Sequence, residues 1–141
     1  MDHVVYVDAK SKELEKLIDG TKSMVIRGAT GRKLPYGRVS AGDILYFINN
    51  NGEGFVRAKS VVKSVLNSEK MEKETSVQLV ENNQEKLQLD SKQFKKWAGK
   101  RYLVLIEVET TAEIESFKID RSNYGNMDDW LPVENISNVI Q

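Results

Sequence analysis

The stretch DGTKSMVIR, which runs from Asp19 to Arg27, combines the end of a helix with a basic turn and the start of a strand. Gly20 follows a helical pattern, at the position where a left-handed residue commonly ends a helix. From Lys22 onward the side chains are expected to alternate between the two faces of an extended strand. The stretch therefore predicts a strand that carries Lys22 on one face and Arg27 on the other.

Positive charge is concentrated around this stretch, although the chain of 141 residues has 21 basic and 21 acidic residues and no net charge. The segment from Lys22 to Arg38 has no acidic residue and contains Lys22, Arg27, Arg32, Lys33 and Arg38. A neutral chain with a pI near 6.6 is not expected to bind polyanions over its whole surface. Any contact with nucleic acid must therefore come from a local patch such as this one.

Apolar patterns predict a mainly β structure with a helix near the start. Ser11–Asp19 has Leu and Ile at helical spacing, and we expect Ser11 to cap this helix. Asn49–Gly54 has the composition of a tight hairpin turn. Strands are expected at Val4–Val7, Ser23–Arg27, Asp43–Asn49, Gly54–Val65 and Tyr102–Glu109.

The middle of the chain is more polar. Asn67–Asp90 predicts an irregular insertion with one short helix that packs on the sheet. Ser91 then suits the N-cap of a helix that ends at Ala98 and carries Phe94 and Trp97 among several lysines: Lys92, Lys95, Lys96 and Lys100. In such an arrangement the aromatic rings could stack on the bases of single-stranded RNA while the lysines neutralise its phosphates. We favour the alternative, an amphipathic helix that buries the two rings under a lysine-coated face.

The pattern Gly20-x-Lys22-x-x-x-x-Arg27, followed by Gly42-Asp43 and a strand, resembles the signature of the ASCH domain. That domain belongs to the PUA-like superfamily of small β-barrels associated with RNA. The usual ASCH form has a Glu three residues after the Lys, where this sequence has Val25. The segments Gly52–Ala58 and Lys100–Val108 resemble the second hairpin and the closing strand of PUA-like proteins.

This resemblance covers roughly Val4 to Glu109 and implies a fold. We expect an α+β protein, built as a PUA-like mixed β pseudo-barrel flanked by short helices. Residues 1–141 are expected to form one domain, because their number suits a single core.

The resemblance also implies a site that binds RNA or a nucleotide-like small molecule, in a cleft between the barrel and its first helix. A Lys point charge and a planar Arg suit a phosphate or a polar base edge, and loop aromatics could stack a base. The predicted ligand-binding residues are Lys22, Arg27, Arg32, Lys33, Tyr36, Tyr124 and Trp130. Five of them also have a simpler interpretation: Arg27 in an ion pair with an acidic residue such as Glu107, Lys22 as an exposed turn residue, and each of the three aromatics as a partly buried anchor.

Three other functions stay open, two enzymatic and one of protein interaction. Some ASCH-like proteins resemble small amidohydrolases that act on acylated cytidine, and Lys22 matches their Lys. Val25 stands at the position of their nucleophile and has no hydroxyl, while Ser23 lies roughly 6–7 Å away along a strand. Acidic residues toward the C-terminus could hold Mg²⁺ for RNA cleavage, but they match no recognised spacing. We therefore predict no catalysis, with a protein-interaction module built on Asn67–Asp90 as the remaining alternative.

Composition disfavours several further classes. The absence of cysteine removes disulfides and thiolate chemistry. The one histidine, His3, is expected to be solvated, and Gly28–Gly37 lacks the spacing of a P-loop or of G-x-G-x-x-G. We expect no metal and no cofactor. Without an apolar leader or a membrane-spanning run, we expect a soluble cytoplasmic protein with no membrane contact.

Overall fold

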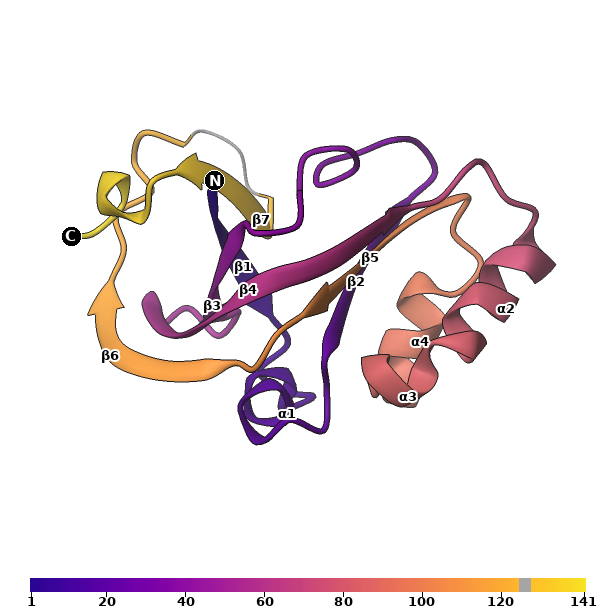
Figure 1. Cartoon of the computed structure of the whole chain (residues 1–141), viewed down its shortest axis with the longest axis horizontal. Helices are drawn as coiled ribbons and strands as arrows, with labels where there is room; N and C mark the ends of the chain where they lie inside the picture. The colour runs from indigo at the N-terminus through magenta and orange to yellow at the C-terminus, as the bar shows by residue number, and fades with distance from the viewer. Residues whose placement is uncertain (125–127) are drawn as a thin grey trace.

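Figure 1 shows the computed structural model of the chain, which describes residues 1–124 and 128–141. Within these residues the sheet consists of seven strands: β1 (Asp2–Val7), β2 (Met24–Ala29), β3 (Ile44–Asn49), β4 (Phe55–Asn67), β5 (Tyr102–Val108), β6 (Ala112–Lys118) and β7 (Trp130–Glu134). The helices are α1 (Glu13–Asp19), α2 (Lys73–Asn82), α3 (Gln84–Leu87), α4 (Ser91–Trp97) and the 3₁₀ turn η1 (Ile136–Asn138). All five predicted strands and the predicted first helix are present.

The long strand β4 gives the sheet its curvature. The strand order is β2-β5-β4-β3-β1-β7, and β6 also pairs with β4. As far as Val61, β4 pairs with β3, and from Val62 it pairs with β5. β1 runs parallel to β3, whereas the other pairs are antiparallel. The product is a curled, mixed half-barrel with short helices, which confirms the predicted pseudo-barrel architecture.

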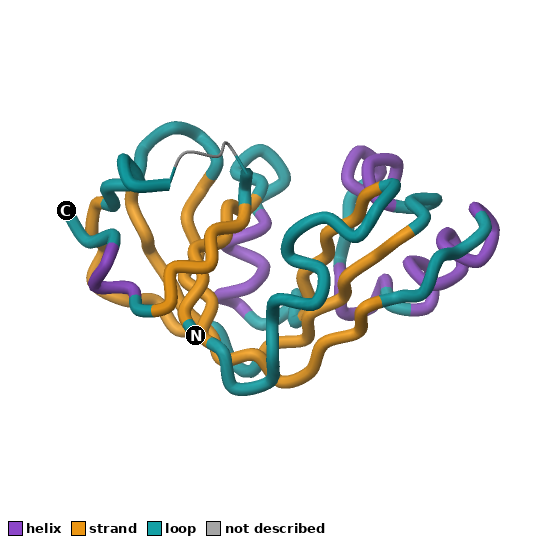
Figure 2. Tube along the Cα trace, turned by 90° about the horizontal axis from the view of Figure 1, so that it is seen from above, coloured by secondary structure: helices purple, strands orange, loops and turns teal. Residues whose placement is uncertain are grey.

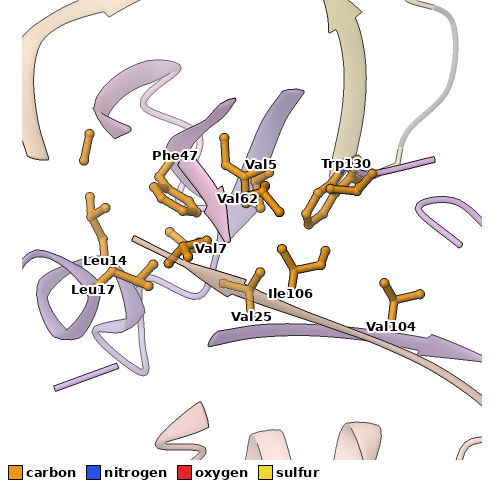
Figure 3. Packing of buried hydrophobic residues seen from close by; sticks show 14 residues of the cluster. Val5, Val7, Leu14, Leu17, Val25, Phe47, Val62, Val104, Ile106 and Trp130 are labelled. Carbon is orange, nitrogen blue, oxygen red and sulfur yellow. The ribbon is translucent and has the colours of Figure 1, made fainter. Parts of the chain in front are cut away.

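The main core fills the concave side of the half-barrel (Figure 3). Val25 from β2 and Ile106 from β5 lie near Trp130 from β7, and all three side chains are fully buried. Leu14 and Leu17 bring α1 into the same cluster. Complete burial of an aliphatic side chain contributes about 1.5–3 kcal/mol. The alternation predicted for β2 is confirmed, because Val25 faces this core and its neighbours Met24 and Ile26 face the opposite side.

Helices α2, α3 and α4 gather at one end of the molecule, while α1 lies apart from them (Figures 1 and 2). They cover the outer face of β2 and β5, where Val80 and Leu87 are fully buried against Ile26 and Leu105. The segment Asn67–Asp90 packs on the sheet as predicted, but it forms two helices, α2 and α3, rather than an irregular insertion with one short helix. Helices this short owe their stability to tertiary packing of their apolar faces rather than to local helix propensity.

The predicted helix caps are also corrected. Lys12, in a left-handed conformation, precedes α1 without a side-chain cap bond. The hydroxyl of Ser11 instead donates to the Asp90 carboxylate at 2.6 Å. Asp90, not Ser91, caps α4 and forms a reciprocal capping box with Gln93. The Ser11–Asp90 bond thereby ties the start of α1 to the start of α4.

His3 is buried rather than solvated. Its side chain has no exposed surface, because β1 lies between β3 and β7. Trp130 Nε1 lies 3.1 Å from His3 Nδ1, and His3 Nε2 lies 2.9 Å from Asp43 Oδ2. An indole N–H can only donate, so Nδ1 accepts and Nε2 carries the proton that is donated to Asp43. The neutral imidazole therefore joins β1 to β7 and to the turn before β3.

Acid is expected to weaken the fold through His3. Burial lowers the pKa of His3 below its usual 6.5, although the bond to Asp43 opposes this shift. His3 of the unfolded chain is therefore protonated near pH 6.5, whereas His3 of the folded chain is protonated only at lower pH. Because the unfolded state then binds more protons, the free energy of unfolding falls as the pH drops below about 6.5. Urea denaturation between pH 7.5 and 5 measures this slope, which cannot exceed about 1.4 kcal/mol per pH unit for one proton.

The matched variant is His3→Gln, which cannot titrate in this range. Because the chain has one histidine, this variant is expected to lose the slope above pH 5. An unchanged slope in His3→Gln would contradict the assignment of the effect to His3.

No helix among the described residues combines the length and the apolar character needed to cross a lipid bilayer.

Candidate functional site

Three adjoining cavities form a groove between the half-barrel and α4, which we call the α4 groove. The outer cavity measures about 610 Å³ and lies between Asp8–Lys10, Asn50–Asn51 and the α4 residues Lys92, Gln93 and Lys96. The middle cavity measures about 40 Å³, and Arg27 and Trp97 are among its lining residues. The far cavity, about 320 Å³, extends past Arg27 to Lys33 and Asp128. Lys96 is among the lining residues of all three cavities, so they adjoin one another along α4.

Arg27 lies at the centre of this groove. Its Nη1 donates to the Ile26 carbonyl at 2.8 Å and its Nη2 donates to the Tyr6 carbonyl at 2.6 Å. β1 and β2 are not neighbours in the sheet. The bond to Tyr6 therefore clasps these two strands together across the open side of the half-barrel, which we call the seam. The guanidinium also lies 5.5 Å from the ring of Trp130 and 5.8 Å from that of Trp97.

One side of the Arg27 guanidinium is incompletely satisfied. Its Nε lies 3.4 Å from Asp129 Oδ2, in an ion pair. Within the described residues, this buried Nε has no hydrogen-bond partner. The Asp129 side chain is 50% exposed, so a ligand could displace it. Arg27 thus forms a structural clasp and retains one buried donor without a hydrogen bond among the described residues.

Lys22 does not converge with Arg27. Its side chain is buried at 2% exposure, so the interpretation as an exposed turn residue is wrong. Its Nζ donates to the Leu87 carbonyl and lies 3.4 Å from Glu13 Oε2. Burial lowers the pKa of Lys22, and the charge of Glu13 opposes that shift. In this conformation Lys22 joins β2 to α1 and α3, and its ammonium is already paired.

The remaining predicted cations lie at different places. Lys33 pairs with Asp128 at 3.6 Å and lines the far cavity. Arg32 stacks over the rings of Tyr36 and Tyr102, at 5.6 and 5.7 Å. Arg27 pairs with Asp129 instead of Glu107, which lies 3.0 Å from Lys86. Of the predicted cations, only Arg27 and Lys33 therefore share the groove.

The predicted aromatic residues serve mainly as anchors. The Tyr36 hydroxyl donates to the Ser68 carbonyl, and its ring packs against the main core. Tyr124 is partly buried against a second cluster, which includes Leu131. Trp130 has no exposed surface on which a base could stack. The structure places Trp97 of α4 along the groove instead.

Sequence reasoning missed the contribution of α4. Lys96, whose Nζ lies 4.8 Å from the Trp97 ring centroid, was assigned to a solvated coat of the helix. No local pattern indicates Lys10 or Gln93, because only the fold brings the ends of β1 and β3 next to α4. The interleaving of lysines with Phe94 and Trp97 was the available signal. Phe94 and Trp97 both pack, partly buried, against the cluster under the helices, as predicted for an amphipathic helix.

A metal centre has no support in residues 1–124 and 128–141. No group of three or more His, Asp or Glu side chains there is arranged to hold an ion. The acidic pair Asp128 and Asp129 is engaged by Lys33 and Arg27.

The structure is a curled, mixed half-barrel with short helices over one end. More specifically, the chain has an ASCH-like fold. It superposes on the crystal structure of ASCH from Zymomonas mobilis with a TM-score of 0.67 and 12% sequence identity, covering 99% of this chain and 96% of that chain. Two crystal structures of point mutants of that protein match with TM-scores of 0.66 and 12% identity, covering 94% of this chain and 91% and 89% of those chains.

No family model matches the sequence, and neither does any curated protein. At 12% identity the structural similarity establishes the fold alone.

Proposed function

We propose that the chain binds single-stranded RNA or a nucleotide-like ligand in the α4 groove, without catalysis. The observation that carries this proposal is the position of Lys96, which lines all three cavities and lies beside Arg27 and Trp97 in two of them. The ASCH-like fold is associated with RNA binding, which agrees with this interpretation. Proteins that bind single strands combine a cationic groove with aromatic rings on which bases stack.

The charges of the groove support an anionic ligand. Four carboxylates line it, and each has a local partner. Asp8 accepts from the Ser11 N–H, Glu13 pairs with Lys22, Asp128 with Lys33 and Asp129 with Arg27. Among the described residues, three lysines of the groove have no ion-pair partner: Lys10, Lys92 and Lys96.

Binding is expected to be modest and salt-dependent. Three lysine contacts to a single strand give a slope of log K against log salt of about −2, at roughly 0.7 per contact. The affinity is expected to be on the order of micromolar or weaker at physiological salt, since the rest of the surface is neutral. Fluorescence anisotropy with short labelled RNA, single-stranded and duplex, at several salt concentrations measures both quantities.

Lys96→Glu is the decisive variant. It is expected to weaken RNA binding by about tenfold or more, because one charge-assisted contact is lost and a repulsive charge is added. The salt slope is expected to fall by about 0.7. Lys95→Glu makes the same charge change one residue away, outside the three cavities, and is expected to bind nearly like wild type. Equal effects of the two variants, or no RNA binding at low salt, would refute the proposal.

The amidohydrolase alternative finds no support at Val25. Its side chain is fully buried and its strand neighbour is Ile106. We expect the protein to hydrolyse N4-acetylcytidine to cytidine no faster than the reaction proceeds in buffer alone, as measured by chromatography. Turnover that Lys22→Ala abolishes would instead establish an enzyme and would direct attention to Ser23.

The interaction-module alternative is also less favoured. In the insertion that forms α2 and α3, Val80 and Leu87 are turned toward the sheet. The exposed face of α2 is polar around Glu74, Gln78 and Asn82.

A further inference from the structure

The outer cavity of the α4 groove is held in place by hydrogen bonds between distant segments. β1 and β3 are parallel, so their carboxyl ends meet at one edge, with Val7 opposite Asn49. The Asn50 N–H donates to the Val7 carbonyl at 3.0 Å, and Asn50 Oδ1 accepts from the Ala9 N–H at 3.0 Å. The Ser11–Asp90 bond fixes the opposite wall, on α4. The cavity is therefore a preformed part of the fold.

The charge of this cavity is positive on balance. Lys10, Lys92 and Lys96 line it, and Asp8 is its one carboxylate. Asp8 Oδ1 already accepts from the Ser11 N–H at 3.1 Å. None of the three lysines has an ion-pair partner in the described residues. Flexible ammonium groups around a cavity suit a phosphate, which accepts from several donors at once.

The sizes of the cavities limit what each can hold. The middle cavity, about 40 Å³, has room for a small polar group but not for a sugar or a base ring. The outer cavity, about 610 Å³, has room for a nucleoside with its phosphate. A group that enters the middle cavity meets Arg27, whose Nε lacks a hydrogen bond among the described residues.

We propose that Lys10, Lys92 and Lys96 form a phosphate subsite, so that the ligand of the groove is a phosphorylated nucleoside unit rather than a free nucleoside. This inference rests on the proposed function and specifies the ligand of the same site. The phosphate comes either from a nucleoside monophosphate or from the backbone of an RNA strand. In both cases the lysines neutralise it, while a polar atom of the nucleoside accepts from Arg27.

The test compares ligands that differ only by phosphate, on the full chain at low salt by calorimetry. The probes are cytidine and adenosine, their 5′-monophosphates, inorganic phosphate and a short single-stranded RNA. The variant is Lys10→Gln with Lys92→Gln. Its matched control is Lys70→Gln with Lys95→Gln, which removes the same charge from exposed lysines outside the α4 groove.

We expect a monophosphate to bind about tenfold more tightly than its nucleoside, as one or two charge-assisted contacts allow. This preference is expected to vanish in the Lys10/Lys92 variant and to persist in the control. RNA could also be the only probe that binds. The subsite is then supported if the Lys10/Lys92 variant, but not the Lys70/Lys95 control, lowers the salt slope of RNA binding by about 0.7–1.4. In that case the phosphate comes from the RNA backbone.

Other outcomes overturn the inference. Equal binding of nucleoside and monophosphate to wild type, or RNA binding that the Lys10/Lys92 variant leaves unchanged, removes the subsite while the proposed function stands. Inorganic phosphate that binds as tightly as a monophosphate identifies a simple anion site and contradicts the nucleoside requirement. Absence of binding by RNA and by every nucleotide removes both proposals together.

Discussion

Glu13→Ala is expected to lower the free energy of unfolding by about 3–5 kcal/mol, because it leaves the ammonium of Lys22 buried without its countercharge. Glu13 and Lys22 are 6% and 2% exposed, so solvent screens their interaction little. Glu13 Oε1 also accepts from the Asp8 N–H at 2.9 Å, and this bond is lost as well. Urea denaturation followed by circular dichroism measures the change.

The pH dependence of the Glu13→Ala protein provides a second readout. Burial lowers the pKa of Lys22, and removal of Glu13 removes the charge that opposes this shift. The unfolded chain then holds a proton that the folded chain releases, so the stability of the variant is expected to rise as the pH increases toward about 10.5.

The double variant Glu13→Leu with Lys22→Met removes both charges and is expected to recover most of the loss. A loss below about 1 kcal/mol in Glu13→Ala would contradict a buried pair.

Arg27→Met is expected to lower the free energy of unfolding by about 2–4 kcal/mol, because each lost bond to a charged donor contributes about 1.5–3 kcal/mol. The clasp to Tyr6 is lost, while the methionine retains much of the apolar bulk. The chain has two tryptophans, and both lie near Arg27. Tryptophan fluorescence during urea denaturation therefore reports on this part of the seam.

Arg32→Met is the matched control, since Arg32 is exposed and lies over Tyr36 and Tyr102. It is expected to change stability by no more than about 1 kcal/mol. Hydrogen exchange at Tyr6, whose N–H donates to the Asp129 carbonyl, is expected to speed up in Arg27→Met only. Equal stability of the two variants would show that Arg27 does not close the seam.

The strands were predictable from sequence because their patterns are local. In β2 the alternation of Met24, Val25 and Ile26 already separates the two faces that the core clusters occupy. The Asn-rich turn after β3 likewise predicted the β3–β4 hairpin. Only one short helix was predicted where α2 and α3 form, because their buried side chains, such as Val80, gain stability only against β2 and β5.

The site was harder to predict because its contacts join distant parts of the chain. The Lys22 ammonium bonds to a carbonyl 65 residues away, and His3 bonds to Trp130 across 127 residues. No local spacing indicates either partner. The cleft predicted between the barrel and its first helix differs from the α4 groove, although Arg27 and Lys33 line that groove. The residues of α4 and Lys10 come together only through the topology. Their roles in binding are proposals.

The central claim is that the α4 groove is the ligand-binding surface, and amide chemical-shift mapping tests it most directly. The ¹⁵N-labelled chain is titrated with short single-stranded RNA at low salt. We expect the largest shifts at Lys10, Asn50, Gln93, Lys96 and the Trp97 indole, with smaller shifts at Arg27. Shifts concentrated instead on α2 or β6, with the groove residues unchanged at saturation, would contradict the claim.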